Sequence, residues 1–248
     1  MKDYNFQGKV WLADRLSTGK PNKLVWVDDA SVLQIKLATD IEERQESYSG
    51  NRLTSVRITK AKKAEFTLTL NAFSKENLAL GLYGAVQTVV GAAVVDEVLP
   101  ASLANNDIIK LDKAGVSALT VKDSAGTPAT VAPANYSLLS AAAGLLQILN
   151  IGTYVQPFKA SYTYESGVNV AMFTAAAPER YLILDGINTV DNSRVLVRGY
   201  RMRFDPVDQL DLISDSLGSL SLKGALLYDS LNAADANLGG FGRIEMAS

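Results

Sequence analysis

The chain contains neither cysteine nor histidine among its 248 residues. The lack of cysteine excludes disulfides, thiolate nucleophiles and thiolate metal ligands. The lack of histidine removes the commonest general base and the commonest transition-metal ligand. An enzyme of this composition would depend on carboxylates, lysine, tyrosine or serine. We therefore expect a protein that is not an enzyme and that uses no cofactor.

Net charge is also nearly absent, because 24 basic residues stand against 26 acidic ones. A surface built to hold nucleic acid needs a positive excess, and the whole chain has none. A nearly neutral chain can associate with copies of itself without much repulsion. Hydrophobic residues make up 48% of the sequence, which is enough to bury a sizeable core.

Long apolar runs are missing. The most apolar stretch, Ala85 to Val95, is too short to cross a bilayer and contains a glycine, Gly91. The first ten residues are polar and lack the apolar centre of a signal peptide. These features predict a soluble protein that is made in the cytoplasm and has no membrane partner.

What the sequence does contain is alternation of apolar and polar residues at period two. It is clearest from Ala64 to Asn71, where Ala64, Phe66, Leu68 and Leu70 oppose Glu65, Thr67, Thr69 and Asn71. Residues 32–41, 159–165 and 220–228 alternate in the same way. Strands with one apolar and one polar face are typical of antiparallel sheets. We predict a mainly β fold built of antiparallel sheets.

One short helix interrupts the strands. Ser74 is a plausible N-cap, residues 75–83 are good helix formers, and Gly84 is a natural stop. A single apolar stripe would place this helix against a sheet. The stripe consists of Leu78, Leu82 and Tyr83.

Residues 40–63 have the pattern of a long hairpin whose first arm is acidic and whose second arm is basic. The segment between the arms, residues 47–51, is rich in turn-forming residues. Both arms contain too few apolar residues to lie in a core. Two interpretations remain open: a solvated hairpin with paired cross-strand charges, or an arm that projects onto a neighbouring subunit.

A change of composition near Gly91 predicts an inserted domain. Residues 91–152 are rich in Ala, Val, Ser, Asn and Asp, with short strand-like pieces and strong turn signals. We expect a small β domain inserted between residues 1–90 and 153–230 of the main domain. Residues 231–248 contain many Ala, Asn and Gly, which predicts a flexible tail or an arm.

No motif in the sequence supports catalysis or metal binding. Gly19-Lys20 lacks the rest of a phosphate-binding loop, and the glycines at 239–242 open no helix. The aspartates of residues 205–215 lack the spacing of a calcium loop. A basic strand at 194–203 is better explained by ion pairing than by nucleic-acid binding. We expect no catalytic residue and no metal site.

Two segments carry a family resemblance. The first is the threonine-bearing strand at 64–71, followed by the helix sequence Ser74-Lys75-Glu76-Asn77-Leu78-Ala79-Leu80 and its closing glycine. The second runs from Phe204-Asp205-Pro206 to Leu217–Gly224. Together they resemble the major tail-tube proteins of long-tailed bacteriophages. They cover about half of the chain when the inserted segment, which resembles small β modules of virion proteins, is included.

This resemblance implies a β-sandwich-like core shared with the tube protein of the type VI secretion system. It implies homohexameric rings that stack into a virion tail tube, with a lumen that conducts DNA during genome ejection. The implied partners are other copies of the chain, a tape-measure protein, a tail terminator and baseplate or tip proteins. DNA would pass through without specific binding.

Under this hypothesis the polar strand faces would line the lumen. The candidates are Gln34, Lys36, Asp40, Glu42, Glu65, Thr67, Thr69 and Asn71. A plain solvated sheet face explains any one of them almost as well. The hairpin would supply the contacts between rings or subunits. Its candidates are Glu43, Glu46, Tyr48, Asn51, Arg52, Arg57, Lys60 and Lys62.

Three other classes of protein compete with this interpretation. A minor tail or baseplate protein would share the strands but would not polymerise alone into uniform tubes. A secretion-system tube protein shares the fold but tends to lack an inserted module. An adhesion or carbohydrate-binding module would need exposed aromatic platforms, and Trp11 and Trp26 are too few.

Overall fold

The computed structural model describes residues 3–246. Residues 1 and 2 of the predicted main domain, and residues 247 and 248 of the predicted C-terminal arm, lie outside the described residues. The chain divides into two compact units. The core unit contains the chain up to Val86 and again from Val170, and the inserted unit is Gln87–Asn169. An inserted β unit was predicted, but its expected end at residue 152 was wrong.

The boundary was misplaced because of β11 (Lys159–Tyr164), which was predicted to belong to the main domain. It lies between β6 (Ala92–Val98) and β8 (Val116–Lys122) and pairs with both. Its alternation was predicted correctly, since Ala160 and Tyr162 are buried. Alternation shows which face of a strand is buried but not which core covers that face.

The inserted unit is a pair of three-stranded sheets around its own apolar core. One sheet has the order β6-β11-β8 and the other the order β7-β10-β9. Leu111, Val121, Leu146 and Phe158 lie at the centre of the core. A two-stranded sheet of β12 and β5 stands where the chain enters and leaves this unit. The remaining elements are β5 (Val86–Val89), β7 (Ile108–Lys110), η1 (Pro133–Asn135), β9 (Tyr136–Ser140), β10 (Leu145–Ile148) and β12 (Gly167–Val170).

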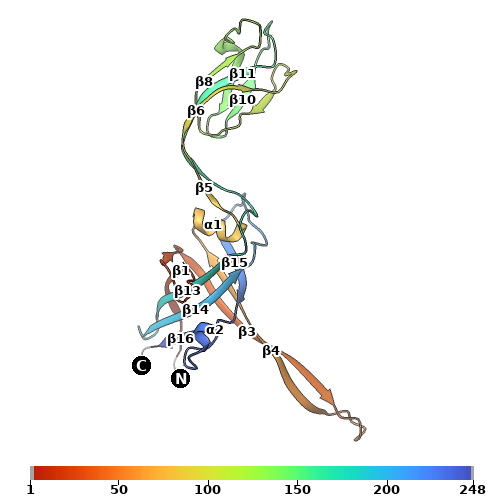
Figure 1. Cartoon of the computed structure of the whole chain (residues 1–248), viewed down its shortest axis with the longest axis vertical. Coiled ribbons are helices and arrows are strands. Elements are labelled where there is room, and N and C mark those ends of the chain that lie inside the picture. The colour runs from red at the N-terminus through yellow and green to blue at the C-terminus, as the bar shows by residue number, and fades with distance from the viewer. Residues whose placement is uncertain (1–2, 247–248) are drawn as a thin grey trace. The chain divides into compact units, whose positions relative to one another are not determined.

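The core unit is built on one antiparallel sheet, which confirms the predicted mainly β fold (Figure 1). Its strand order is β2-β1-β13-β14-β15-β4-β3, and β16 pairs with the first half of β14 beside β15. The strands are β1 (Phe6–Asp14), β2 (Val25–Trp26), β3 (Ala30–Gln45), β4 (Thr54–Leu70), β13 (Glu179–Asn188), β14 (Arg194–Phe204), β15 (Leu220–Leu226) and β16 (Gly242–Met246).

The apolar faces of β4 and β15 form the centre of this unit's core. Phe66 and Leu68 stand opposite Gly224 and Leu222 in the ladder, and the two leucines and Phe66 are buried. The ring of Phe66 meets that of Phe204 edge to face, with 4.9 Å between centroids. Gly224 is required here because a Cβ would lie 2.8 Å from the Phe66 ring.

The helix α1 (Lys75–Leu82) begins as predicted, with the Ser74 side chain accepting a hydrogen bond from the Asn77 amide. Its predicted end needs a correction. The left-handed residue is Tyr83, with φ of 51°, and the Gly84 amide donates to the Ala79 carbonyl. Glycine is needed at 84 for space, because a Cβ there would lie 2.4 Å from the Ala171 carbonyl oxygen.

The buried face of α1 also differs from the prediction. Asn77, Leu80 and Gly81 are buried, whereas Leu78 and Leu82 are only half-buried. Gly81 lets the helix approach Leu222 closely, which turns the buried face away from the predicted leucines. The Asn77 amide group donates to the Val27 carbonyl at 3.0 Å and so ties the helix to the chain near β2. Within residues 3–246, no helix is long and apolar enough to span a membrane.

Residues 231–246 are ordered, contrary to the predicted flexible tail or arm. They form α2 (Ser230–Ala233) and β16, and β16 pairs with β14. The Arg15 guanidinium holds both carboxylate oxygens of buried Asp229, at 2.9 and 2.7 Å. Composition did not predict this order because the partners of the segment lie on β14 and after β1, far away in sequence.

Replacing Asp229 tests this attachment. The Arg15 guanidinium lowers the pKa of Asp229 to about 2, so the carboxylate stabilises the fold above pH 4 and loses this effect as pH falls towards 2. Asp229→Asn should lower the free energy of unfolding by roughly 2–3 kcal/mol, because each unit by which the pKa of the carboxyl group is lowered corresponds to about 1.4 kcal/mol. Urea unfolding at pH 7 measures this. Asp235→Asn, an exposed control, should change it little.

Candidate functional site

The polar face of β3, β4 and β15 is the first candidate surface. Gln34 stands opposite Thr67 and Lys36 opposite Glu65. Thr67 has Lys223 as its other neighbour. Because alternate residues share a face, these side chains all point away from the core formed by Phe66 and Leu68. A polar strip therefore crosses three strands of the core unit.

This strip carries charges of both signs that are paired with one another. Lys36 lies 3.4 Å from the Glu65 carboxylate, and Lys223 lies 2.6 Å from that of Asp208. A shallow hollow of about 350 Å³ lies among these residues, with Thr67 and Gln34 on its wall. Paired, solvent-exposed ions bind anions weakly, so the face is polar but close to neutral.

The ladder shows where each predicted lumen residue lies. Seven of them share the polar face of β3 or β4: Gln34, Lys36, Asp40, Glu42, Glu65, Thr67 and Thr69. Asn71 follows the end of β4, where its side-chain amide donates to Asp29 at 2.7 Å. The register thus brings onto one face residues that the sequence shows only as two separate alternating segments. That this face lines a lumen stays a prediction.

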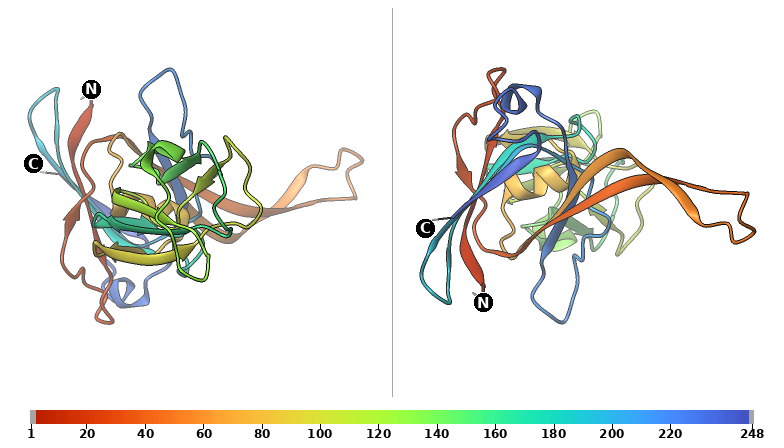
Figure 2. Two further views of the ribbon diagram at one scale, coloured as in Figure 1. Left: turned by 90° about the horizontal axis from the view of Figure 1, so that it is seen from above. Right: turned by 90° about the horizontal axis from the view of Figure 1, so that it is seen from below.

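Beyond the core, β3 and β4 continue together as a two-stranded projecting arm, residues 40–63 (Figure 2). Its charges pair across the strands, as the first interpretation of the hairpin predicts. Glu43 pairs directly with Arg57, and the other two ion pairs are Lys60 with Glu42 and Lys63 with Asp40. Because all of these groups are well exposed, each pair adds little to stability.

The tip of the arm is organised by one carboxylate, that of Glu46. It accepts hydrogen bonds from the amides of Tyr48 at 2.8 Å, Ser49 at 2.9 Å and Leu53 at 3.2 Å, and from the Ser49 hydroxyl. These bonds, the Ser49 hydroxyl first, lower the pKa of Glu46 to about 2. Sequence reasoning counted Glu46 as one more acidic arm residue and missed this role.

The ordered tip presents apolar and basic groups to solvent. Tyr48 is 89% exposed, and Leu53 is exposed beside it. Arg52 is held in the left-handed conformation with φ of 49°, and the Asn51 amide donates to the Ser49 hydroxyl. A tip that is both apolar and ordered before any contact is suited to docking on another surface.

The edge strand β3 differs from the predicted half-buried strand. Its alternation is correct, but only Ala30 and Leu33, near the start of the strand, pack against the core. Leu37 is 76% exposed, and Ile35 and Ile41 are exposed as well. The core ends near Leu33, so no other element of residues 3–246 covers the apolar face further along. Within the same residues, β3 has a hydrogen-bonded neighbour on one side only, β4.

The basic strand lies in β14, and glutamates neutralise two of its arginines. Arg201 pairs with Glu179 at 2.6 Å and Arg198 lies 2.8 Å from Glu245. Glu179 is on β13 and Glu245 on β16, and both of these strands pair with β14. This pairing supports the expected ion-pair role of the strand.

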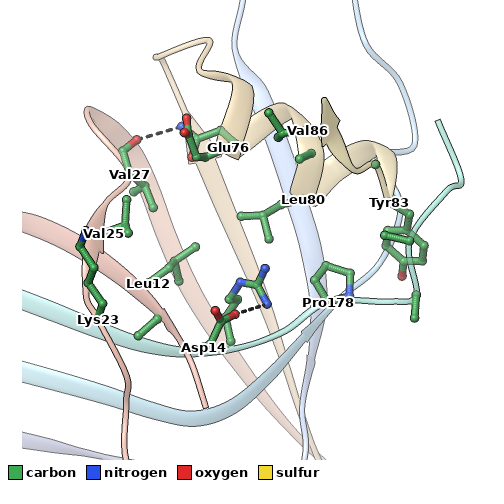
Figure 3. A pocket seen from close by; sticks show the side chains of 17 residues that line it. Leu12, Asp14, Lys23, Val25, Val27, Glu76, Leu80, Tyr83, Val86 and Pro178 are labelled. Atoms are coloured by element: carbon green, nitrogen blue, oxygen red, sulfur yellow. Dashed lines mark hydrogen bonds and ion pairs between the residues drawn. The ribbon is translucent and has the colours of Figure 1, made fainter. Parts of the chain in front are cut away.

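A second hollow, of about 410 Å³, lies between α1 and the edge strand β2 (Figure 3). Leu12, Val25, Val27 and Leu80 give it apolar walls. The charged groups Asp14 and Arg180 on its lining are paired at 2.8 Å. Two further charged side chains, Lys23 and Glu76, also line this hollow.

The fold and these surfaces define a mainly β protein with an uncovered sheet edge, a neutral polar face and a projecting arm. The sequence pattern of one family, described as protein of unknown function UCP028589, matches residues 3–245. The chain belongs to that family. No curated protein matches the sequence.

Glu46→Gln tests the role of the tip carboxylate. The uncharged amide accepts hydrogen bonds less strongly, so the backbone amides of Tyr48, Ser49 and Leu53 should exchange with solvent several-fold faster. Amide hydrogen exchange followed by NMR at pH 7 measures this. Since Glu46 lies far from either core, the melting temperature should stay unchanged. Glu43→Gln, which removes a neighbouring charge, should leave the three exchange rates as they are.

Low pH should also loosen the tip, and so reduce the protection of these three amides relative to their intrinsic exchange rates at the same pH. A carboxyl group with a lowered pKa stabilises the tip above its ordinary pKa of about 4.3 and loses this effect as pH falls towards 2. Exchange rates that were equally slow in Glu46→Gln and in the unaltered chain would show that other contacts hold the tip.

Proposed function

We propose that this protein is a structural subunit of the tail tube of a long-tailed bacteriophage. Copies associate through their sheet edges into rings, and the rings stack through the projecting arms. The observation that carries this proposal is the uncovered edge of β3, a strand of 16 residues with a neighbour on one side only among residues 3–246.

A long exposed edge strand pairs readily with another strand, so stable monomers shorten, charge or cover such edges. Here the edge is long, and the apolar side chains of Ile35 and Leu37 are exposed on the side of the sheet that faces the core. Pairing with a second copy would satisfy the free backbone groups and cover these side chains. The chain on its own is therefore an incomplete sheet.

The two ends of the sheet differ, and this favours a ring over a simple dimer. One end is the long strand β3, and the other is β2, whose two residues pair with Trp11 and Leu12 of β1. Contact between unlike ends is head to tail, and such a contact closes into a ring or continues as a filament. Closure into a barrel removes every edge.

The two segments that resemble tail-tube proteins lie side by side in the core unit. The strand of the first segment, in β4, pairs with the β15 part of the second from Leu70–Leu220 to Phe66–Gly224. The helix of the first segment contacts the second where the Val207 amide donates to the Gly81 carbonyl. The two segments therefore form one continuous part of the core unit, and this supports the tail-tube proposal.

The polar face of β3, β4 and β15 is the proposed lumen wall. DNA is held by basic surfaces through release of counterions, and it slides over a surface that offers no excess of cations. On this face Lys36 is offset by Glu65 and Lys223 by Asp208. Before DNA passes, the same wall would surround a tape-measure protein, and the tube ends would meet a terminator and the baseplate.

Electron microscopy of the purified protein is the primary test. At high concentration it should form tubes or stacked rings of uniform diameter with a central lumen. A protein that stays monomeric, or that joins only in closed dimers, contradicts the proposal. A protein that assembles only on a preformed base points to the alternative, a minor tail or baseplate component.

Glu65→Lys tests the lumen wall. It places a second lysine beside Lys36 in every copy, so assembled tubes should retain a short duplex DNA at least about tenfold more strongly at low salt, and lose it as salt rises. Co-sedimentation of labelled DNA measures this. Glu76→Lys, an equal charge change on α1, is the control and should retain less. Equal retention by the two variants would place Glu65 away from the lumen.

Deleting Glu46 to Arg52 tests the arm. The removed residues contribute to neither hydrophobic core, so the monomer should keep its melting temperature. Rings should still form, but the long tubes seen by electron microscopy should be lost. Tubes of normal length after this deletion would exclude a stacking role for the tip.

A further inference from the structure

A second exposed surface lies at the opposite end of the core unit from the arm. It is the loop of residues 205–219, which joins β14 to β15 and projects from the sheet (Figure 2). Its base is fixed by Val207 and Leu210, which pack against the core. Its apex, residues 211–217, carries Ile213, which is 98% exposed, the equally exposed Leu217, and Leu212, which is 76% exposed.

Large apolar side chains with this exposure bury almost none of their surface within one copy. Exposed apolar clusters of this kind mark surfaces that bind another molecule. The loop is also strongly acidic, with four aspartates and no basic residue from 205 to 219. Asp208 pairs with Lys223, whereas Asp211 and Asp215 have no cation partner among residues 3–246.

The arm tip has the opposite character. Residues 40–63 contain six basic and four acidic side chains, and the acidic ones are all engaged, three in ion pairs and Glu46 in the tip. Within the described residues, Arg44 and Arg52 have no ion-pair partner. They stand beside the exposed apolar side chains of Tyr48, Leu53 and Val56.

We propose that the apex of the 205–219 loop of one copy docks on the arm tip of a second copy. Leu212, Ile213 and Leu217 would cover Tyr48, Leu53 and Val56 of that copy. Asp211 and Asp215 would face Arg44 and Arg52. The two surfaces match in apolar character and are opposite in charge, which is the pattern that sets partner choice and register at interfaces.

The placement of the two surfaces makes the contact head to tail. Leu220, where the loop ends, pairs with Leu70 at one end of β4, while the arm tip follows Gln45 and precedes Thr54 at the other end. At the usual rise per residue the seventeen residues of β4 separate them by about 50 Å. One copy cannot join its own two surfaces, so the contact repeats from copy to copy along an axis.

The order within each surface reduces the entropic cost of the contact. Glu46 fixes the tip before docking, and the packed base of the loop limits the freedom of its apex. This contact rests on the proposed tail-tube function, because it assigns a binding surface to the arm that stacks the rings. Which two surfaces meet is a separate question from whether the rings form a tail tube.

Cross-linking tests the contact directly, since the chain has no cysteine. Ile213→Cys and Leu53→Cys would be purified separately, mixed under conditions that favour assembly, and oxidised. A disulfide-linked pair should form in the mixture and not in either variant alone. Val190→Cys, an exposed cysteine on the β13–β14 turn, replaces Ile213→Cys as the matched control and should give no such pair.

Charge reversal tests the electrostatic part. Asp211→Lys with Asp215→Lys, or Arg44→Glu with Arg52→Glu, should each raise the concentration needed for assembly at least about tenfold. All four changes in one chain should restore it to near the original value. A combined variant that assembles as poorly as either pair, or reversals without any effect, would overturn the proposal.

The outcomes separate this inference from the proposed function. Tubes without the Ile213–Leu53 cross-link leave the tail-tube function standing and remove the loop as the arm's receptor. The cross-link in chains that form fibres or pairs but never hollow tubes keeps the contact and removes the tail-tube function. An unaltered chain that stays monomeric at high concentration removes both.

Discussion

The pairing of β4 with both of its neighbours determines most of what the core unit presents to its surroundings. The last seven residues of β4 lie between β3 and β15, so their apolar face is covered and their polar face is presented across three strands. The first ten residues have only β3 beside them. One strand therefore changes from sheet centre to projecting arm at the point where β15 ends, at Leu226 opposite Ala64.

The same kinds of charged residue therefore have different roles in the sheet and in the arm. In the sheet, a lysine and a glutamate on facing positions make a neutral polar surface, as Lys36 and Glu65 do. In the arm, similar pairs add no core and little stability, but they neutralise three of its basic residues. Of the arm's cations without an ion pair among residues 3–246, Lys62 lies at the base of the arm, and Arg44 and Arg52 lie near the tip, where Glu46 holds the chain in one conformation. Order at the tip comes from backbone hydrogen bonds to one carboxylate and not from packing.

Several features could be predicted because they depend on local chemistry alone. The alternation of β4 and β15, the Ser74 cap and the acidic and basic strands of the hairpin all follow from residues close in sequence. Other features could not. The end of α1 was misassigned because space beside Ala171, not backbone conformation, requires glycine at 84. Glu46 was not distinguished from its acidic neighbours because its partners are amides, which every residue supplies.

The sequence by itself determined the strand faces, the start of helix α1, the charge pattern of the arm and the presence of an inserted β unit. It did so because side-chain periodicity, capping and turn chemistry act over a few residues. Only the tertiary structure decided that β11 belongs to the inserted unit, that the C-terminal strand completes the side of β14, and that the core ends near Leu33 and leaves Leu37 bare. These depend on which distant strand lies alongside, and a strand's own pattern is the same whether a neighbour covers it or not.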